Sequence, residues 1–581
     1  MHFSRTQTAL AAAALFIVAT LLVPNVQAST FTVINTLDSG AGSLRQAITD
    51  ANGTAGADTI VFAIPGSGLH TIAPTTNLPT ITEAVIIDGY SQAGSSANTL
   101  ALGDNAILQI EVTGTAISNG IGFNLSAAVT SGEIRGLLIT KWNNAIQMSG
   151  TTNFIIDGNF FGTNATATAT SSATANGNAF FILNSAANNT VGGATAAARN
   201  IISGSTTAGI TMGNSGTTGN VIQNNYIGTN AAGTGALPNL QGISLNSPDA
   251  NTIRGNVISG NNISATFSAG ISIINLGNHI LVVGNKIGTT ADGTAPLPNT
   301  YGITLSDGFS GGALSNTIGT QAEPNTIAFN TKAGVALQAF TSKTSRLNTI
   351  RYNSIYSNGT LGIDLGDDGI TPNDSGDGDT GLFNDLQNFP VLTSAQFGAG
   401  TLTIAGTLNS MSSSAYNVQF FQSTACDPSG AGEGQTFLGE ATVNTDASGI
   451  GTFNVNFPGT AAGVVTATAT DSLGNTSEFS ACQAITTPVL PQISISDAAL
   501  VEGNAGTSLM TFNVILSAAS AATVTVNYAT ADQTATAGSD YVAGSGTVTF
   551  SPGQTTKPVT VSINGDVTAE ADETLLVNLS A

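Results

Sequence analysis

Short apolar runs return at a regular distance along the first two thirds of the chain. The dipeptide Gly-Ile, once Gly-Val, recurs at intervals of 33, 28, 32, 32 and 28 residues, at Gly209, Gly242, Gly270, Gly302, Gly334 and Gly362. A second marker, an aromatic or aliphatic residue followed by Gly-Thr, occurs at Phe161, Ile227 and Ile287. Repeats of about 30 residues are too small to bury their own apolar side, so neighbouring repeats must stack into one core.

Within each repeat, asparagine returns every five residues and an isoleucine follows two positions later. The asparagines are Asn220 and Asn225, Asn251 and Asn256, and Asn348 and Asn353, the last pair continued by Asn358. Rows on an α-helix fall at three and four residues, so this spacing excludes a helical face. It favours short strands separated by turns, with asparagine either in the left-handed conformation or stacked on its copy one coil away. A pentapeptide-repeat solenoid is the alternative, but its period would not break at each Gly-Ile strand.

Two segments at the ends of this region resemble a known family. The segment GAGSLRQAITDAN, from Gly40 to Asn52, resembles the N-terminal element of bacterial surface proteins with right-handed β-helix repeats. The segment GIDLGDDGITPNDSGDGD, from Gly362 to Asp379, is similar to the way those helices end. The resemblance implies a right-handed parallel β-helix with an N-terminal cap over residues 29–390, and it implies nothing about chemistry.

Strict alternation of apolar and polar residues begins after Pro390. Runs such as TLTIA from Thr401 and GVVTATAT from Gly463 predict an immunoglobulin-like β-sandwich over residues 391–485. This segment contains both cysteines of the chain, Cys426 and Cys482. Residues 486–491 contain two prolines and are expected to form a linker.

The last 90 residues resemble, in order and spacing, the Calx-β domain of sodium–calcium exchangers and bacterial surface proteins. The resemblance rests on VEGNAG, NYATADQTATAGSDYVAGSGTVTFSPGQTTKPVTVSI and GDVTAEADETLLVNLS, and it covers residues 492–581. The family's final strand and terminal acidic run are missing, so we expect an incomplete domain and a longer natural product. The chain as a whole is therefore predicted to be all-β, a solenoid followed by two β-sandwich domains.

Composition and charge narrow the possible partners. Charged residues make up only 8% of the chain, and 34 acidic against 12 basic residues give a formal charge of −22. This charge excludes a nucleic-acid-binding surface but suits divalent cations.

The N-terminus predicts export. Arg5 precedes the apolar run from Ala9 to Val23, and a small-residue cleavage site ends at Ala28, so residues 1–28 read as a signal peptide. An uncleaved anchor is the alternative. No second apolar stretch long enough to span a membrane follows. We therefore expect a secreted or cell-surface protein, and an oxidising compartment favours a Cys426–Cys482 disulfide.

Calcium is the predicted cofactor. By the Calx-β resemblance, its ligands fall on Glu502, Asp540, Asp566, Glu570 and Glu573. Residues 492–581 contain eight acidic residues and one basic residue, Lys557, and a cation would relieve the repulsion between carboxylates on neighbouring loops. The exchangers carry a longer acidic run where this chain has Asn564 and Gly565, so one or two weak sites are expected. The alternative is a solvated acidic loop.

A second acidic group follows the last repeat. Its members lie among glycines and asparagines, at Asp364, Asp367, Asp368, Asp374, Asp377, Asp379 and Asp385. The spacing does not match an EF-hand loop. A Gly/Asp-rich loop that caps the solenoid and an irregular calcium site both remain open.

The residues favour a non-catalytic, adhesin-like structural protein in cell–surface or cell–cell interaction, with surface glycans or proteins as partners. The alternative is a polysaccharide hydrolase or lyase. Paired carboxylates for glycoside hydrolysis would come from Asp364 with Asp367 or Asp368, but the repeats contain one histidine, His279, and scattered basic residues. Trp142 could stack on a sugar, although a lone tryptophan in a strand more often packs in the core.

Overall fold

The computed structural model describes residues 28–262, 268–341, 344–487 and 490–581. The predicted signal peptide up to residue 27, and residues 488 and 489 of the predicted linker, lie outside these ranges. The described chain divides into two compact units, and the boundary in the sequence lies between Thr486 and Thr487. Each unit is considered by itself below.

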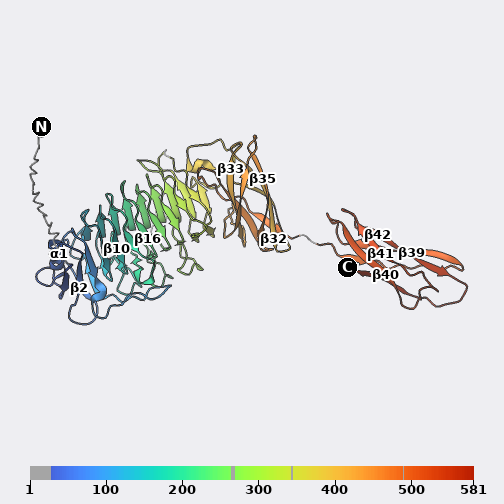
Figure 1. The fold of residues 1–581 in the computed structure, drawn as a ribbon, viewed down its shortest axis with the longest axis horizontal. Helices are drawn as coiled ribbons and strands as arrows, with labels where there is room; N and C mark the ends of the chain where they lie inside the picture. Colours follow the sequence, from blue (N-terminus) through green and yellow to red (C-terminus); the bar gives the residue numbers. More distant parts are fainter. Residues whose placement is uncertain (1–27, 263–267, 342–343, 488–489) are drawn as a thin grey trace, which may run out of the picture. The chain divides into compact units, whose positions relative to one another are not determined.

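The first unit begins with stacked coils in which each full turn contributes one strand to each of three parallel sheets (Figure 1). The first sheet contains β1 (Thr30–Val33), β2 (Asp58–Phe62), β4 (Val85–Asp88), β7 (Gly132–Arg135), β10 (Phe154–Asp157), β13 (Thr190–Gly192), β16 (Val221–Gln223), β19 (Thr252–Arg254), β22 (Leu281–Val283), β25 (Thr317–Ile318) and β28 (Thr349–Ile350). The second contains β3 (His70–Ile72), β5 (Ile110–Thr113), β8 (Leu138–Thr140), β11 (Phe160–Phe161), β14 (Ile201–Ile202), β17 (Tyr226–Ile227), β20 (Val257–Ile258), β23 (Lys286–Ile287), β26 (Thr326–Ala328) and β29 (Ser354–Tyr356).

The third sheet lies along the remaining side of the coils. It contains β6 (Ile121–Leu125), β9 (Asn144–Ser149), β12 (Asn178–Leu183), β15 (Ala208–Gly213), β18 (Gln241–Asn246), β21 (Ala269–Ile274), β24 (Tyr301–Ser306), β27 (Val335–Gln338) and β30 (Ile363–Leu365). Inward side chains from all three sheets, such as Ile243, Ile253 and Ile258, are fully buried in one continuous core. The predicted parallel β-helix is thereby confirmed.

The Gly-Ile marker stands at the start of the third-sheet strands. Each isoleucine or valine pairs with its copy in the next coil, as Ile271 does with Ile303 and Ile303 with Val335. The glycine is needed because the coils approach closely there. A Cβ on Gly302 would lie 2.4 Å from the carbonyl oxygen of Gly334, a distance at which backbone atoms must move.

The repeated asparagines form ladders along the solenoid. In one ladder the side-chain amide of Asn225 donates to Oδ1 of Asn256, and that of Asn256 donates to Oδ1 of Asn285, both at 3.0 Å. The predicted stacking is therefore correct. The left-handed residue is the one before the ladder asparagine, as at Asn224 with φ of 58° and Tyr352 with φ of 64°.

Helix α1 (Leu44–Gly53) covers the N-terminal end of the core with Leu44, Ala47, Ile48 and Ala51. Ser43 begins it as N-cap, accepting a hydrogen bond from the backbone N–H of Gln46 at 3.2 Å. Three short 3-10 turns are η1 (Gly89–Ser91), η2 (Ala196–Ala198) and η3 (Phe383–Leu386).

Residues 391–486 form a largely antiparallel set of strands within the same unit. They are β31 (Val391–Gly398), β32 (Thr401–Asn409), β33 (Ala415–Ser423), β34 (Thr436–Asn444), β35 (Ile450–Pro458), β36 (Val464–Thr470) and β37 (Gln483–Thr486). Strand β37 pairs with both β31 and β36, and the strands share their own core around Phe420 and Val465. The predicted disulfide joins Cys426 to Cys482. The immunoglobulin-like assignment and the domain boundaries stay predictions.

This segment closes the C-terminal end of the solenoid. Phe421 and Phe479 belong to the solenoid core, and the carboxylate of Glu433 accepts the amide of Asn358, the last asparagine of its ladder, at 3.0 Å. Glu478 accepts the backbone N–H of Leu365 at 2.9 Å. The aspartate-rich loop, for which the sequence left a cap and a calcium site open, also takes part, because Asn384 accepts the N–H of Asn348 at 3.0 Å and Phe383 and Leu386 pack against the solenoid core.

The second unit is a β-sandwich of two antiparallel sheets. One contains β38 (Ile493–Ile495), β39 (Gly506–Leu516) and β42 (Thr556–Gly565), and the other β40 (Val524–Asp532), β41 (Ser545–Phe550) and β43 (Leu575–Ser580). Val514, Phe550 and Val559 are buried between them. In the described residues no helix is long and apolar enough to cross a membrane.

Candidate calcium site

The five predicted calcium ligands come from three connections of the second unit. Glu502 lies between β38 and β39, and Asp540 lies in the turn between β40 and β41. Asp566 follows the last residue of β42, and Glu570 and Glu573 lie further along the connection to β43.

The structure brings these connections together. One carboxylate oxygen from each of Asp540, Glu570 and Glu573 lies within 4.8 Å of the other two. Glu502 joins from the second connection, where its Oε1 accepts the backbone N–H of Asp566 at 3.2 Å. The negative charges of Asp540, Asp566 and Glu502 all act on Glu570. The five carboxylates therefore face one end of the sandwich.

Hydrogen bonds from the protein fix Asp540. Its Oδ2 accepts the backbone N–H of Thr536 at 2.6 Å, and its carbonyl accepts the N–H of Asn564 at 2.9 Å. Asp532, at the end of β40, holds the same turn by accepting the hydroxyl of Tyr541 at 2.6 Å. The sequence argument missed this supporting role of Asp532. Its place at the end of a strand, nine residues before a buried tyrosine, was the available signal.

The electrostatics of the group are those of carboxylates without a counter-charge. Desolvation and the nearby negative charge of Asp540 raise the pKa of both Glu570 and Glu573. The Thr536 amide lowers the pKa of Asp540. Among the described residues, no lysine or arginine forms an ion pair with any of the five acids.

This donor set fits calcium. Calcium takes six to eight oxygen ligands in a flexible geometry, from carboxylates, carbonyls and water. The five acids supply carboxylate oxygens, and none of them is held in an ion pair among the described residues. The individual ligand assignments stay a prediction.

A comparison with protein-family models decides what this unit is. Residues 492–581 match the family described as "Calx-beta domain". The C-terminal unit is a Calx-beta domain. The match covers residues 492–581, so the name applies to this domain alone.

Curated relatives share a short stretch with the chain. The sodium/calcium exchanger 1 proteins of Canis lupus familiaris and Rattus norvegicus are each 52% identical over 58 residues. That stretch is 10% of this chain and 6% of each exchanger, so the chain spans a small fraction of these relatives. The exchangers' names state a calcium-transport role for those proteins.

Solved structures were also found to be similar. The calcium binding domain CBD12 of CALX1.1 is 12% identical, with a TM-score of 0.14, over 30% of this chain and 72% of that one. An alginate lyase from Paenibacillus sp. str. FPU-7 is 16% identical, with a TM-score of 0.28, over 58% of this chain and 98% of that one. Scores at this level carry no argument about what this chain does.

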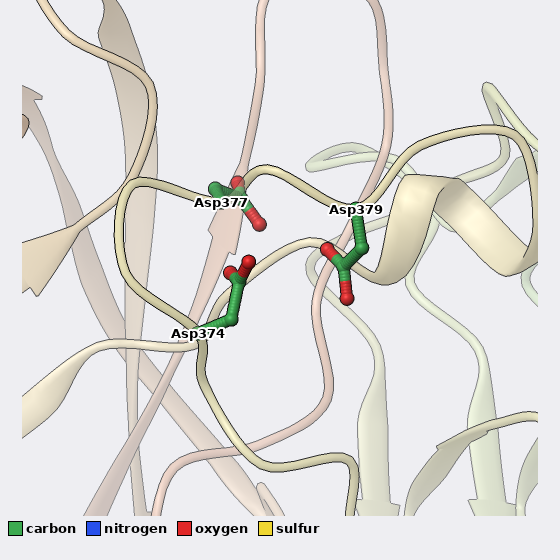
Figure 2. A group of neighbouring side chains, drawn as sticks. All are labelled: Asp374, Asp377 and Asp379. Atoms are coloured by element: carbon green, nitrogen blue, oxygen red, sulfur yellow. The ribbon is translucent and has the colours of Figure 1, made fainter.

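The second acidic group is not one cluster. Asp374, Asp377 and Asp379 gather in the loop after β30, with one oxygen of each within 4.8 Å of the others (Figure 2). Asp377 is buried and accepts hydrogen bonds from Gln387 Nε2 at 2.7 Å and the Asn388 N–H at 3.0 Å. Burial raises its pKa to about 6. The carboxylate of Asp377 therefore serves to hold the loop in its folded conformation.

The remaining aspartates of that group lie elsewhere. Asp385 forms an ion pair with Arg346 at 3.5 Å. Asp364, in β30, is 3% exposed and burial raises its pKa to about 6. Asp367 accepts the hydroxyl of Tyr301 at 2.8 Å and the amide of Gln338 at 2.9 Å.

Trp142 packs inside the solenoid. It is 1% exposed, and its indole N–H donates to the carbonyl of Val112 at 3.1 Å. It is unavailable for stacking on a sugar. His279 lies on the surface against Asp249, at 2.7 Å.

Proposed function

We propose that the chain is an exported, non-catalytic surface protein whose Calx-beta domain binds calcium and whose solenoid is a rigid, adhesin-like scaffold. One observation carries the calcium part. Five carboxylates from three connections face one end of the domain, and no cation of the described chain is paired with them. The family match and the exchanger relatives add to it.

A bound calcium ion would replace the repulsion between the carboxylates of these connections with their common coordination to the ion. Glu502, Asp566 and the acids before β43 belong to different parts of the sandwich, so an ion held between them resists their separation. Binding to the folded form alone also raises the free energy of unfolding of the domain.

Calorimetric titration of the full chain with calcium chloride tests the site. We expect a dissociation constant on the order of 0.1–1 mM, the range of extracellular modules. Glu573→Gln removes a charge from the group of three and should weaken binding at least tenfold.

Asp572→Asn is the matched control. It makes the same change of charge in the same connection, at a residue outside the group of three. It should alter the affinity by less than twofold. No heat of binding at 10 mM calcium, or an equal loss in both variants, contradicts the proposal.

Export is proposed from the first 28 residues and fits the disulfide, which persists in oxidising compartments. Cell fractionation followed by N-terminal sequencing tests it. The mature protein should lie outside the cytoplasm and begin at Ser29. A cytoplasmic protein that begins at Met1 contradicts it.

The absence of catalysis is proposed because basic residues are scattered along the solenoid, and the histidines among its described residues are His70, in β3, and His279, on the surface. The residues that a glycosidase would use are Asp364 and Asp367. Incubation of the wild type and Asp367→Asn with neutral and acidic polysaccharides tests this. Release of reducing ends by the wild type and not by the variant would replace the proposal with a polysaccharide hydrolase.

A further inference from the structure

A groove of about 460 Å³ lies on the outer face of the third sheet. Its floor is built from β18, β21, β24 and β27, and its walls come from the connections that follow β24 and β27. Its volume lies within the range of small-molecule and oligosaccharide sites. No function described above uses it.

The floor presents hydroxyl and amide groups in register. Ser272 pairs with Thr304, so one hydroxyl stands on each of two neighbouring coils. In the next outward row, Ser306 pairs with Gln338. Neighbouring strands are about 4.8 Å apart, so these polar groups repeat along the solenoid at the spacing of the strands.

One wall carries two exposed aromatic rings. Phe309 is 96% exposed and Phe340 is 59% exposed, on connections one coil apart. Exposed phenylalanine is costly in water, and two that line the same groove mark a contact surface. The backbone beneath Phe340 is fixed, because Asp307 accepts its N–H and that of Thr341. Because hydrogen bonds hold the backbone that carries Phe340, less conformational entropy is lost when its ring contacts a ligand.

Tyr301 lies at the other end of β24 and is held by neighbouring side chains. Its hydroxyl donates to Asp367 at 2.8 Å, and the ammonium group of Lys332 lies 2.8 Å from the same oxygen. The Lys332 ammonium also lies 4.7 Å from the centre of the ring. The groove therefore lies between a fixed phenol and the two phenylalanines.

The charges of the residues at the groove indicate which class of ligand it favours. Among the described residues that line the groove there is no lysine, arginine or histidine. The one carboxylate, Asp307, is fully buried and engaged with the connection after β27. The Lys332 ammonium at the Tyr301 end is already engaged with that phenol, and Asp307 is engaged with the opposite wall, so the charged groups nearest the described lining already have partners.

We infer that this groove binds a neutral oligosaccharide. A pyranose ring has an apolar C–H face that stacks on Phe309 or Phe340, and hydroxyl groups that exchange hydrogen bonds with the serine, threonine and amide groups of the floor. The combination of aromatic wall and polar floor fits this class, and because the Lys332 ammonium is held by Tyr301, a uronic acid chain is expected to bind less tightly than a neutral one. The inference is independent of calcium binding, since the groove belongs to the other unit.

Titration calorimetry of the full chain in calcium-free buffer tests it. The probes are hexasaccharides of β-1,4-glucose, α-1,4-glucose, β-1,4-mannose and β-1,4-N-acetylglucosamine, with hexagalacturonate as the acidic comparison. We expect at least one neutral hexasaccharide to bind with a dissociation constant below 1 mM, and at least tenfold more tightly than hexagalacturonate.

Two variants locate the site. The double variant Phe309→Ala/Phe340→Ala should lower the affinity at least tenfold, and Thr304→Val should lower it without changing the thermal unfolding of the solenoid. Ile155→Ala, which truncates another exposed apolar residue of the solenoid, is the matched control and should leave affinity unchanged.

Three outcomes overturn the inference: no neutral probe binds at 10 mM, hexagalacturonate binds as tightly, or the double variant binds like the wild type. Binding followed by cleavage of the probe would support the groove and overturn the non-catalytic role proposed above. The calcium titration is unaffected by any of these results, so the two proposals fail separately.

Discussion

A ladder asparagine satisfies buried backbone and side-chain groups on three successive coils. Asn256 donates through its amide to Asn285 Oδ1, the carbonyl of Ile222 and the carbonyl of Arg254, and its own Oδ1 accepts both N–H groups of Asn225. It is 1% exposed, so water cannot replace these bonds.

Asn256→Ala should therefore destabilise the solenoid strongly. Several buried donors and acceptors lose their partner at once, and each unsatisfied group costs about 1–3 kcal/mol, so we expect a loss of at least about 3 kcal/mol. Chemical unfolding followed by circular dichroism measures it. Asn454→Ala, at an exposed strand position of the same unit, should change stability by less than about 0.5 kcal/mol; an equal effect would refute the ladder argument.

At the scale of single residues, some of these features could be predicted from the sequence and others could not. The five-residue spacing of asparagines predicted the stack, because a repeated polar residue can satisfy itself against its own copy. The spacing could not show which residue adopts the left-handed conformation, because asparagine, glycine, alanine and tyrosine all occupy that place. The calcium ligands were reached through a family pattern. The groove was not predicted, because its lining comes from four strands about 30 residues apart, and the repeat does not show which of their outward residues gather in one place.

At the scale of the element, the start of each third-sheet strand is restricted by the coil above it. Gly302→Ala places a Cβ 2.4 Å from the Gly334 carbonyl, so backbone on one coil must move. We expect a loss of stability of several kcal/mol, about 2 or more, in thermal unfolding of the first unit.

Gly213 provides the comparison, since it lies at the end of β15 in the same sheet. A Cβ there would meet only the Asn246 carbonyl, at 3.7 Å. Gly213→Ala should be tolerated, within about 0.5 kcal/mol of the wild type. Equal destabilisation by the two alanines would show that the close approach of the coils is not the cause.

The junction between the solenoid and β31–β37 holds buried carboxylates. Burial raises the pKa of Glu433 from 4.5 to about 7. The folded state then holds this proton more tightly than the unfolded chain, so its contribution to stability is fully present below pH 4.5 and is lost as pH rises towards 7.

Glu433→Gln removes this titration and keeps an oxygen acceptor for Asn358. We expect the variant to be more stable than the wild type at pH 8, by up to about 3 kcal/mol, with a smaller difference at pH 5. Urea unfolding at both pH values measures it. The same change at exposed Glu83 should leave the pH dependence as it is in the wild type, and a pH-independent difference at Glu433 would contradict the assignment.

The sequence did not predict this junction. Glu433 and Glu478 stand among turn residues with no repeat to mark them, and their contacts to Asn358 and Leu365 join positions 75 and 113 residues apart. Contacts of that range depend on how the strands β31–β37 are placed against the last coil. Periodicity within either segment carries no information about it.

At the scale of the whole molecule, two compact units predict two unfolding transitions. The solenoid and β31–β37 share buried contacts, whereas the Calx-beta domain has its own core. Differential scanning calorimetry of the full chain should resolve both, and 5 mM calcium should raise the melting temperature of the Calx-beta transition alone. A single cooperative transition, or a calcium effect on the larger one, would contradict the division.

The direction of the asparagine ladder has a consequence for how the protein can change in length. Each rung gives hydrogens towards one end of the column and takes them from the other, so any middle turn is interchangeable with its neighbours. Tandem duplication or loss of one whole turn leaves the column intact. The final turn is different, because Asn358 needs the Glu433 acceptor supplied by the next module. Copy number can therefore drift in the interior, while the last turn and its neighbour must be inherited together.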